Sequence, residues 1–89
     1  MQTTILRLPA VKSRTGLSRS TIYLRIKEGS FPAPVSLGAR AVGWPSTEID
    51  ALNAARIAGK SEDEICALVI DLATWRKTRA QQQLGEIES

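Results

Sequence analysis

One short basic and hydroxyl-rich stretch has the residue types for recognising a ligand. It comprises Ser18, Arg19, Ser20 and Thr21, with Tyr23 one position further on. Arginine bonds guanine in bidentate fashion, and serine and threonine hydroxyls bond either kind of base edge. A tyrosine hydroxyl bonds a phosphate while its ring packs on a sugar. The alternatives are that Tyr23 buries part of its ring, which we expect, and that Thr21 bonds the local backbone.

Four further cations are spaced to hold phosphates around this stretch. Arg14 precedes it, Arg25 and Lys27 follow it, and Arg40 stands in a later glycine-containing turn. We expect the first three to contact phosphates, and Arg40 to reach a neighbouring phosphate or the minor groove. The alternative is a basic helix that faces only solvent.

The net charge is distributed unevenly along the chain. Among 89 residues, twelve Lys and Arg stand against nine Asp and Glu, which gives +3 at pH 7. Residues 1–45 contain seven of these cations and one Glu, whereas residues 46–89 contain five cations and eight acidic residues. A basic half beside an acidic half is typical of a protein that meets a polyanion, such as double-stranded DNA, on one side.

The composition excludes several kinds of site. There is no His and Cys66 is the single cysteine, so a Cys/His zinc site, an intrachain disulfide and a Ser/His or Cys/His pair are excluded. Glu62, Asp63 and Glu64 have the pattern of a helix start, and we expect no enzyme, no metal and no other cofactor. No apolar run approaches ~20 residues and the N-terminus lacks a signal-peptide pattern, so we expect a cytoplasmic protein with no membrane partner.

Two short helices are predicted to position the basic stretch. The first spans residues 9–15, and Gly16 ends it because a left-handed position suits glycine. The second spans about residues 19–28, with Ser18 as its N-cap and an apolar pair, four residues apart, facing inward. Two helices joined by a glycine-containing turn outline a helix-turn-helix, whose second helix enters the major groove.

A β-hairpin is predicted after the second helix. Two short apolar-alternating runs, at 35–37 and 41–44, flank a three-residue loop in which Gly38 serves the backbone geometry. An isolated hairpin is marginal in water, so Trp44 is the expected anchor against the helices. A hairpin in this position is a wing, with Arg40 at its tip.

A third helix is predicted to follow the hairpin. It opens at residues 45–47, and Ile49, Leu52 and Ile57 form its expected inward stripe. Residues 1–59 would then be a winged helix-turn-helix DNA-binding domain, mainly α with a small β-hairpin, to which one extra C-terminal helix is attached.

A capping box of the form S-x-x-E at residues 61–64 predicts the start of this fourth helix. We expect the helix to span about residues 62–82. Its inward side follows the helical core spacing and includes either Trp75 or Arg76. The last residues, 84–89, are expected to fray.

The fourth helix has more apolar residues than one packed side requires. Cys66, Ala67, Ile70 and Ala73 lie away from its core-spaced positions. A helix that is apolar around its circumference needs more than one partner surface. We expect residues 60–83 to pack on the core, to mediate a homo-oligomer through residues 62–82, or to do both. The alternative is that Ile70 and Cys66 are buried within a monomer.

The ordered motifs of the N-terminal part resemble those of one known family. They are LPAV at 8–11, TGLSRSTIY at 15–23, KEGSFPAPV at 27–35, LGARAVGW at 37–44 and EID at 48–50. Over roughly residues 6–58 the chain resembles the AlpA family of prophage regulators. The resemblance implies a small DNA-binding transcriptional regulator whose winged helix-turn-helix is similar to phage excisionases and the MerR DNA-binding head. It also implies that Ser18, Arg19, Ser20, Thr21 and Tyr23 face DNA, with Arg40 in the wing.

One residue departs from the family pattern, which often has a basic side chain where this chain has Leu24. Arg25 follows it, so either one phosphate contact has moved by a position or Leu24 packs inward. No function is carried over to the residues beyond Gly59.

Three functions follow from these observations. The leading prediction is a sequence-specific transcriptional regulator of phage type, with the second helix in the major groove and the wing on the backbone. An excisionase that bends DNA and guides an integrase would use the same surface. A protein–protein adaptor acting through the C-terminal helix is the alternative from another class.

Overall fold

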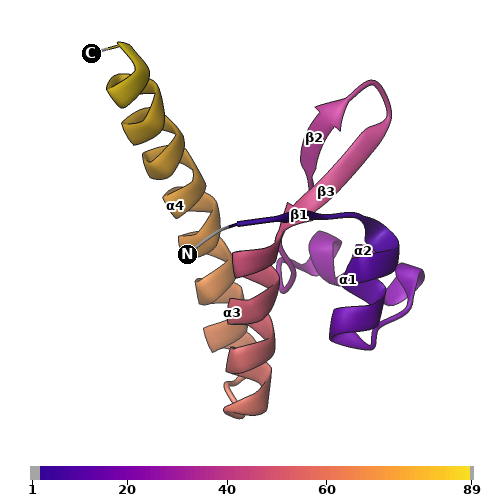
Figure 1. Cartoon of the computed structure of the whole chain (residues 1–89). Helices are drawn as coiled ribbons and strands as arrows, with labels where there is room; N and C mark the ends of the chain where they lie inside the picture. Colours follow the sequence, from indigo (N-terminus) through magenta and orange to yellow (C-terminus); the bar gives the residue numbers. More distant parts are fainter. Residues whose placement is uncertain (1–2, 89) are drawn as a thin grey trace.

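The computed structural model describes the backbone of residues 3–88 and the side chains of residues 3–78. Its elements in chain order are β1 (Ile5–Leu6), α1 (Leu8–Thr15), α2 (Arg19–Glu28), β2 (Val35–Gly38), β3 (Ala41–Pro45), α3 (Ser46–Ile57) and α4 (Glu62–Glu88). The described chain is thus mainly helical, with four helices and a three-stranded antiparallel sheet of order β1-β3-β2. Figure 1 shows α1, α2 and the β2–β3 hairpin on one side of α3 and the long α4 on the other.

Local backbone chemistry fixes the ends of α1 and α2, as the sequence predicts. Gly16 follows α1 in the left-handed region, with φ 71°, and its N–H donates to the Lys12 carbonyl at 2.9 Å. Ser18 caps α2 by accepting a hydrogen bond from the Thr21 N–H at 3.2 Å. Gly29 then ends α2 with φ 85°, which suits glycine because it has no Cβ. The two short helices predicted from the sequence, and the glycine-containing turn between them, are therefore present.

The residues that precede α1 form a strand that the sequence analysis does not predict. This strand, β1, pairs with β3. Ile5 lies opposite Pro45, and Leu6 lies opposite Trp44. Gly43 permits this approach, since a Cβ there would stand 2.5 Å from Ile5 Cγ2 and 3.0 Å from the Leu6 carbonyl oxygen. A strand of two residues has too little pattern to predict its partner.

The hairpin turn is shorter than expected. Gly38 pairs with Ala41, so Ala39 and Arg40 alone form the turn and the predicted three-residue loop is wrong. The ladder shifts by one residue between Ser36 and Gly38, and this bulge brings Gly38 into register. Gly38, with φ 108°, and Ala39, with φ 37°, provide the backbone reversal.

Trp44 anchors the hairpin to the helices, as predicted. Its ring is fully buried and meets Phe31 edge-on, with 6.4 Å between ring centroids, and its Nε1–H donates to the Pro32 carbonyl at 2.9 Å. One apolar cluster joins the sheet to all four helices, so α4 is part of the same core. The buried members of this cluster are Leu6, Val11, Ile22, Phe31, Trp44, Ile49, Leu52 and Ile65.

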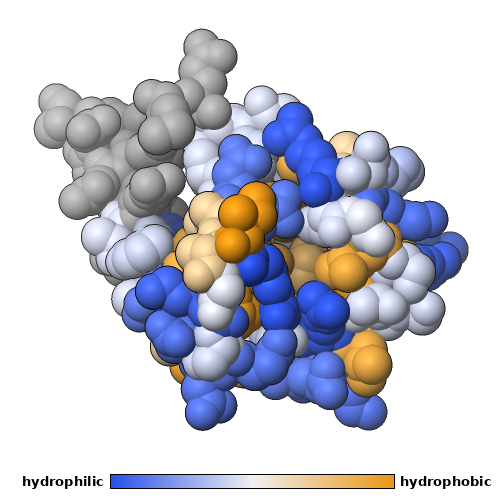
Figure 2. Space-filling view, turned by 90° about the horizontal axis from the view of Figure 1, so that it is seen from below, coloured by the Kyte–Doolittle hydropathy of each residue, from blue (hydrophilic) through white to orange (hydrophobic). Residues whose placement is uncertain are grey.

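The predicted inward stripe of α3 is wrong at one position. Ile49 and Leu52 are buried, but Ile57 is 86% exposed. Eight positions separate Ile57 from Ile49, which rotates it by roughly 80° around the helix, and it is also the last residue of α3. Figure 2 looks onto this end of the molecule and shows separate orange patches within a mostly blue surface.

The predicted capping box starts α4, but the helix is longer than expected. The Ser61 N–H donates to Glu64 Oε1, and the Glu64 N–H donates to Ser61 Oγ, both at 3.2 Å. The helix continues to Glu88, so the end expected near Gln82 is wrong. Fraying of residues 84–89 stays a prediction. None of the helices described here is both long and apolar enough to cross a membrane.

The inner side of α4 carries an arginine where the sequence left the choice open. Arg76, and not Trp75, turns inward, donating to the buried Glu48 carboxylate and, through Nη2, to the Ala33 carbonyl at 2.7 Å. Trp75 is half exposed. Ile70 is 67% exposed and Cys66 is partly buried, so the alternative in which both are buried within a monomer is wrong.

Candidate nucleic-acid interface

Helix α2 has a clear inner and outer face. Ile22 is fully buried and Ile26 is partly buried against the same core. Ser20, Leu24 and Lys27 are all exposed and succeed one another at spacings of four and three residues, so they share one outer stripe. This stripe is the surface of α2 that is free to enter a groove.

The hydroxyls at the start of α2 are engaged mainly with one another. Ser18 Oγ accepts from the Thr21 N–H, and its own hydroxyl donates to Thr21 Oγ1 at 2.9 Å. Ser20 Oγ lies 3.4 Å from Ser18 Oγ, in the exposed region beside them. Ser18 and Thr21 therefore serve the helix cap, whereas the exposed Ser20 contributes to it only the longer contact with Ser18.

A chain of aromatic contacts holds Arg19 against the protein surface. Its guanidinium carbon lies 5.8 Å from the centroid of the Tyr23 ring. Tyr23 is 39% exposed and meets the buried Trp44 edge-on, with 6.5 Å between centroids. Partial burial of Tyr23, the expected alternative, is therefore observed. Because Trp44 belongs to β3, this stack also ties α2 to the hairpin.

Four of the predicted site cations form no ion pair among residues 3–78, and three of these four are exposed. No carboxylate there lies within 4.0 Å of the cationic nitrogens of Arg19, Lys27 or Arg40, which are all exposed. Unneutralised cations in contact with water are the groups that phosphates attract, because binding releases condensed counterions. The electrostatics of α2 and the hairpin turn thus match a polyanion.

Two other predicted site cations lie apart from this set. Arg14 Nη1 is 3.7 Å from Asp50 Oδ1, so its side chain is directed toward α3. Arg25 follows Tyr23 by two positions and therefore lies on the opposite flank of α2. The hydrogen bond from Arg56 lowers the pKa of Glu62, and the nearby Arg25 charge lowers it further. Arg25 is thus near the start of α4.

The β2–β3 hairpin carries Arg40 in its two-residue turn. In Figure 1 the hairpin projects beyond α1 and α2, on the side of the molecule that holds these two helices. Its turn is exposed throughout, from Leu37 to Arg40. The hairpin therefore presents its cation away from the folded body.

Leu24 is an outward-facing residue that sequence reasoning left undecided. Its side chain is 55% exposed, so the alternative in which Leu24 packs inward is wrong. The spacing already contained this information, because Leu24 is two positions from both Ile22 and Ile26, and residues two apart on a helix do not share a face.

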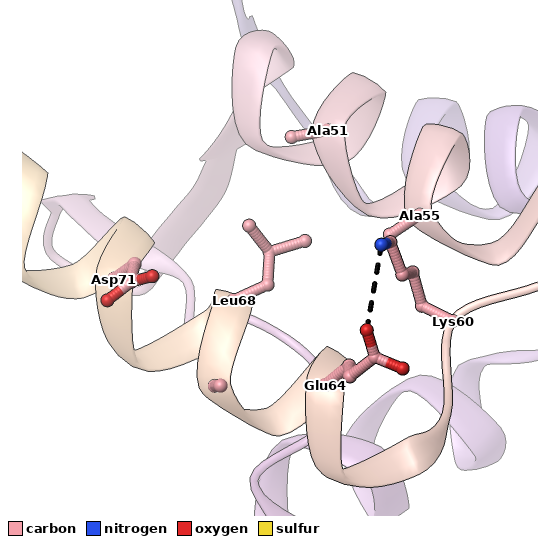
Figure 3. Close-up of a pocket in the computed structure, with 7 residues that line it drawn as sticks. Ala51, Ala55, Lys60, Glu64, Leu68 and Asp71 are labelled. Carbon is pink, nitrogen blue, oxygen red and sulfur yellow. Dashed lines mark ion pairs between the residues drawn. The ribbon is translucent and has the colours of Figure 1, made fainter. Parts of the chain in front are cut away.

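A shallow groove of about 430 Å³ lies elsewhere, between α3 and α4. Figure 3 shows it, with the pair formed by Lys60 Nζ and Glu64 Oε2, 3.6 Å apart, at one end. Its lining residues are Ala51, Ala55, Lys60, Glu64, Ala67, Leu68 and Asp71. Within the residues searched, no three His, Cys, Asp or Glu side chains come together to hold a metal ion.

Comparisons with known proteins match the N-terminal part of the chain. Residues 4–57 match the family described as prophage CP4-57 regulatory protein (AlpA). The chain is 51% identical over 59 residues to the uncharacterized protein ORF88 of Enterobacteria phage P4, covering 66% of this chain and 67% of that protein. It is 48% identical over 52 residues to the DNA-binding transcriptional activator AlpA of Escherichia coli (strain K12), covering 52% of this chain and 74% of that protein. No solved structure matches it.

Proposed function

Because the chain belongs to the AlpA family of prophage regulatory proteins, we propose that it is a DNA-binding transcriptional regulator of phage type. A relative at 48% identity carries the name DNA-binding transcriptional activator. The observation that carries the proposal is the outer surface of α2, where Arg19 and Lys27 are exposed and no carboxylate among residues 3–78 pairs with them.

Helix α2 inserts into the major groove of double-stranded DNA and reads the bases. Residues at the start of such a helix reach base edges. Arg19 is the main reader, because its fork matches the O6 and N7 acceptors of guanine. The Tyr23 ring beneath the guanidinium restricts its motion before DNA arrives. Ser20 adds a hydroxyl, while Ser18 and Thr21 hold the helix start in place and Tyr23 contacts the sugar-phosphate edge.

The remaining cations bind phosphates and set the position of the helix. Lys27 does so at the end of α2, and Arg40 does so from the hairpin, which acts as the wing of a winged helix-turn-helix formed by residues 1–59. Arg14 exchanges Asp50 for a phosphate, because an exposed ion pair contributes only about 0–1 kcal/mol. Arg25 contacts the backbone from the opposite flank of α2.

The segment 60–83 extends this domain and brings two copies together. Supporting this homo-oligomer is the exposure of Ile70 on α4, which no described residue of the same chain covers well. Paired reading heads would bind two half-sites. Light scattering at micromolar concentration measures the mass directly, and a strict monomer contradicts this part of the proposal.

Selection of bound duplexes from a random pool, followed by mobility shifts at fixed salt, tests the function. We expect a defined motif, and Arg19→Ala weakens binding to it by about 1–3 kcal/mol while relaxing the preference at one base pair. Arg19→Lys keeps the charge and loses the fork, so it also relaxes that preference. Arg40→Ala weakens all sequences alike and flattens the salt dependence. Unchanged binding by Arg19→Ala rules the proposal out.

The purified protein and its selected duplex also distinguish the regulator from an excisionase-like protein and from a protein adaptor. An excisionase-like protein bends its site, so circularly permuted fragments would migrate differently, and an integrase would join the complex. A protein adaptor acting through the C-terminal helix would elute from heparin at low salt, whereas a DNA-binding protein elutes late and with a steep salt dependence.

A further inference from the structure

Leu24 occupies the middle of the surface that α2 presents outward. It lies opposite the buried Ile22 and the partly buried Ile26, and it is 55% exposed. Its helical neighbours at three and four positions are all polar and are Ser20, Thr21, Lys27 and Glu28. No side chain of the inner face shares its side of the helix.

This placement differs from that of the other exposed apolar residues near the basic surface. Tyr23 rests on Trp44, and Leu37 lies within reach of β3, since a Cβ on Gly43 would stand 3.2 Å from Leu37 Cδ1. Of the large apolar side chains described in residues 3–45, Leu24 is the most exposed. It stands in a ring of polar groups that includes Lys27, which forms no ion pair with the side chains of residues 3–78.

We infer that Leu24 recognises the 5-methyl group of a pyrimidine in the major groove. The inference rests on the proposed function, because it requires α2 to lie in that groove. The residue at the centre of the outer face then approaches the groove floor most closely. Thymine supplies an apolar group there in unmodified DNA, since the other major-groove features of the base pairs are hydrogen-bond donors and acceptors.

The contact complements the polar readers around it. Arg19 and Ser20 discriminate by hydrogen bonds, whereas Leu24 discriminates by removing a methyl group from water. A methyl group packed against leucine contributes roughly a three- to fivefold preference, which is the expected effect of burying one carbon. Leu24 lies about one helical turn after Ser20, so it contacts a different base pair from the one that Ser20 reads.

Deoxyuridine substitution tests this contact, because it removes the thymine methyl and leaves every hydrogen-bonding group in place. Each thymine of the selected duplex is replaced singly. For the unmodified protein, we expect one position per half-site at which affinity falls about three- to fivefold. Leu24→Ala binds the unmodified duplex more weakly and is indifferent to that replacement. Leu37→Ala is the matched control and keeps the full deoxyuridine effect.

The outcomes separate the two proposals. If selection yields no motif, the proposed function fails. If a motif is found but neither deoxyuridine at any thymine nor 5-methylation of any cytosine changes affinity, or if Leu24→Ala keeps the full effect, the inference about Leu24 is overturned. A second series methylates each cytosine of the motif singly at C5. If one methylation raises affinity for the unmodified protein but not for Leu24→Ala, Leu24 recognises the methyl group of methylcytosine. Far-ultraviolet circular dichroism, which measures helix content, verifies that both variants fold.

Discussion

Arg76 donates two hydrogen bonds to the carboxylate of Glu48, from Nε to Oε2 at 2.7 Å and from Nη2 to Oε1 at 2.5 Å. Glu48 is only 5% exposed and lies within the segment that matches the family, whereas Arg76 lies beyond it. The same Nη2 also reaches the Ala33 carbonyl, in the loop that leads into β2. The C-terminal helix therefore supplies the counter-ion for a buried carboxylate of the N-terminal part.

Replacing Arg76 is expected to destabilise the whole fold. Arg76→Ala leaves Glu48 buried without its partner, and a broken buried pair of this kind costs roughly 3–5 kcal/mol. Urea unfolding followed by circular dichroism measures the change. Adding Glu48→Gln to Arg76→Ala recovers part of the loss, because the uncompensated charge is removed.

The exposed pair of Lys60 and Glu64 provides the control for this effect. Lys60→Ala is expected to cost less than about 1 kcal/mol, because solvent screens the pair. Equal losses for Arg76→Ala and Lys60→Ala would show that the contact with Glu48 has no special role.

A substitution at Ser18 is expected to weaken DNA binding without removing the N-cap of α2. Ser18→Asp keeps an N-cap acceptor for the Thr21 N–H, so the free energy of unfolding stays within about 1 kcal/mol of the original. If this end of α2 meets DNA as proposed, the added negative charge repels phosphates, so DNA affinity falls about tenfold at low salt. The matched control is Ser61→Asp, which makes the same change at the α4 cap and leaves affinity unaltered. A folded Ser18→Asp variant with full affinity contradicts the assigned surface.

Acid is expected to weaken the start of α4. Hydrogen bonds from the Ser61 backbone and side chain lower the pKa of Glu64, and the hydrogen bond from Arg56 lowers that of Glu62. Both carboxylates thus contribute stability above the ordinary value of 4.5, and this contribution is lost as pH falls from there through the lowered values.

Urea midpoints measured between pH 3 and pH 7 check the acid dependence. Glu64→Gln retains the capping geometry without the charge, so its curve is flatter in this interval. Asp63→Asn is the comparison, because Asp63 makes no hydrogen bond or ion pair within the described side chains. Identical curves for Glu64→Gln and the original protein count against the proposed contribution.

Replacing Gly43 by a larger residue is expected to lower the free energy of unfolding. Gly43→Ala places a methyl group against Ile5 Cγ2 and the Leu6 carbonyl, so β1 must move away from β3. Overpacking of this kind costs roughly 1–3 kcal/mol. Thermal unfolding measures it, with Ser36→Ala as an exposed comparison in the same hairpin. A Gly43→Ala protein as stable as Ser36→Ala means that the strands adjust freely.

The features that the sequence predicts correctly are helix ends, which depend on residues close together in the chain. Gly16 fixes the end of α1, Ser18 and Gly29 fix the two ends of α2, and the box at Ser61 and Glu64 fixes the start of α4. Each depends on residues only a few positions apart. The order and bounds of the first two helices follow from these ends alone.

The features that escaped prediction depend on contacts between distant segments. Glu48 and Arg76 are 28 residues apart, so nothing local distinguishes Glu48 from a surface carboxylate at a helix start. Ile57 is apolar, but it lies at the end of α3, beyond the part of the helix that packs on the core, and is exposed. The direction of Arg14 toward Asp50 likewise follows from the way α1 packs on α3.

The central claim is that DNA lies against the outer face of α2 and the hairpin turn. Titration of the isotopically labelled protein with its selected duplex, followed by amide chemical shifts, tests it most directly. The account predicts that the largest changes fall in residues 18–28 and 38–41, with small changes in residues 62–78. Changes centred on α4 or on the groove between α3 and α4, with α2 unaffected, would contradict it.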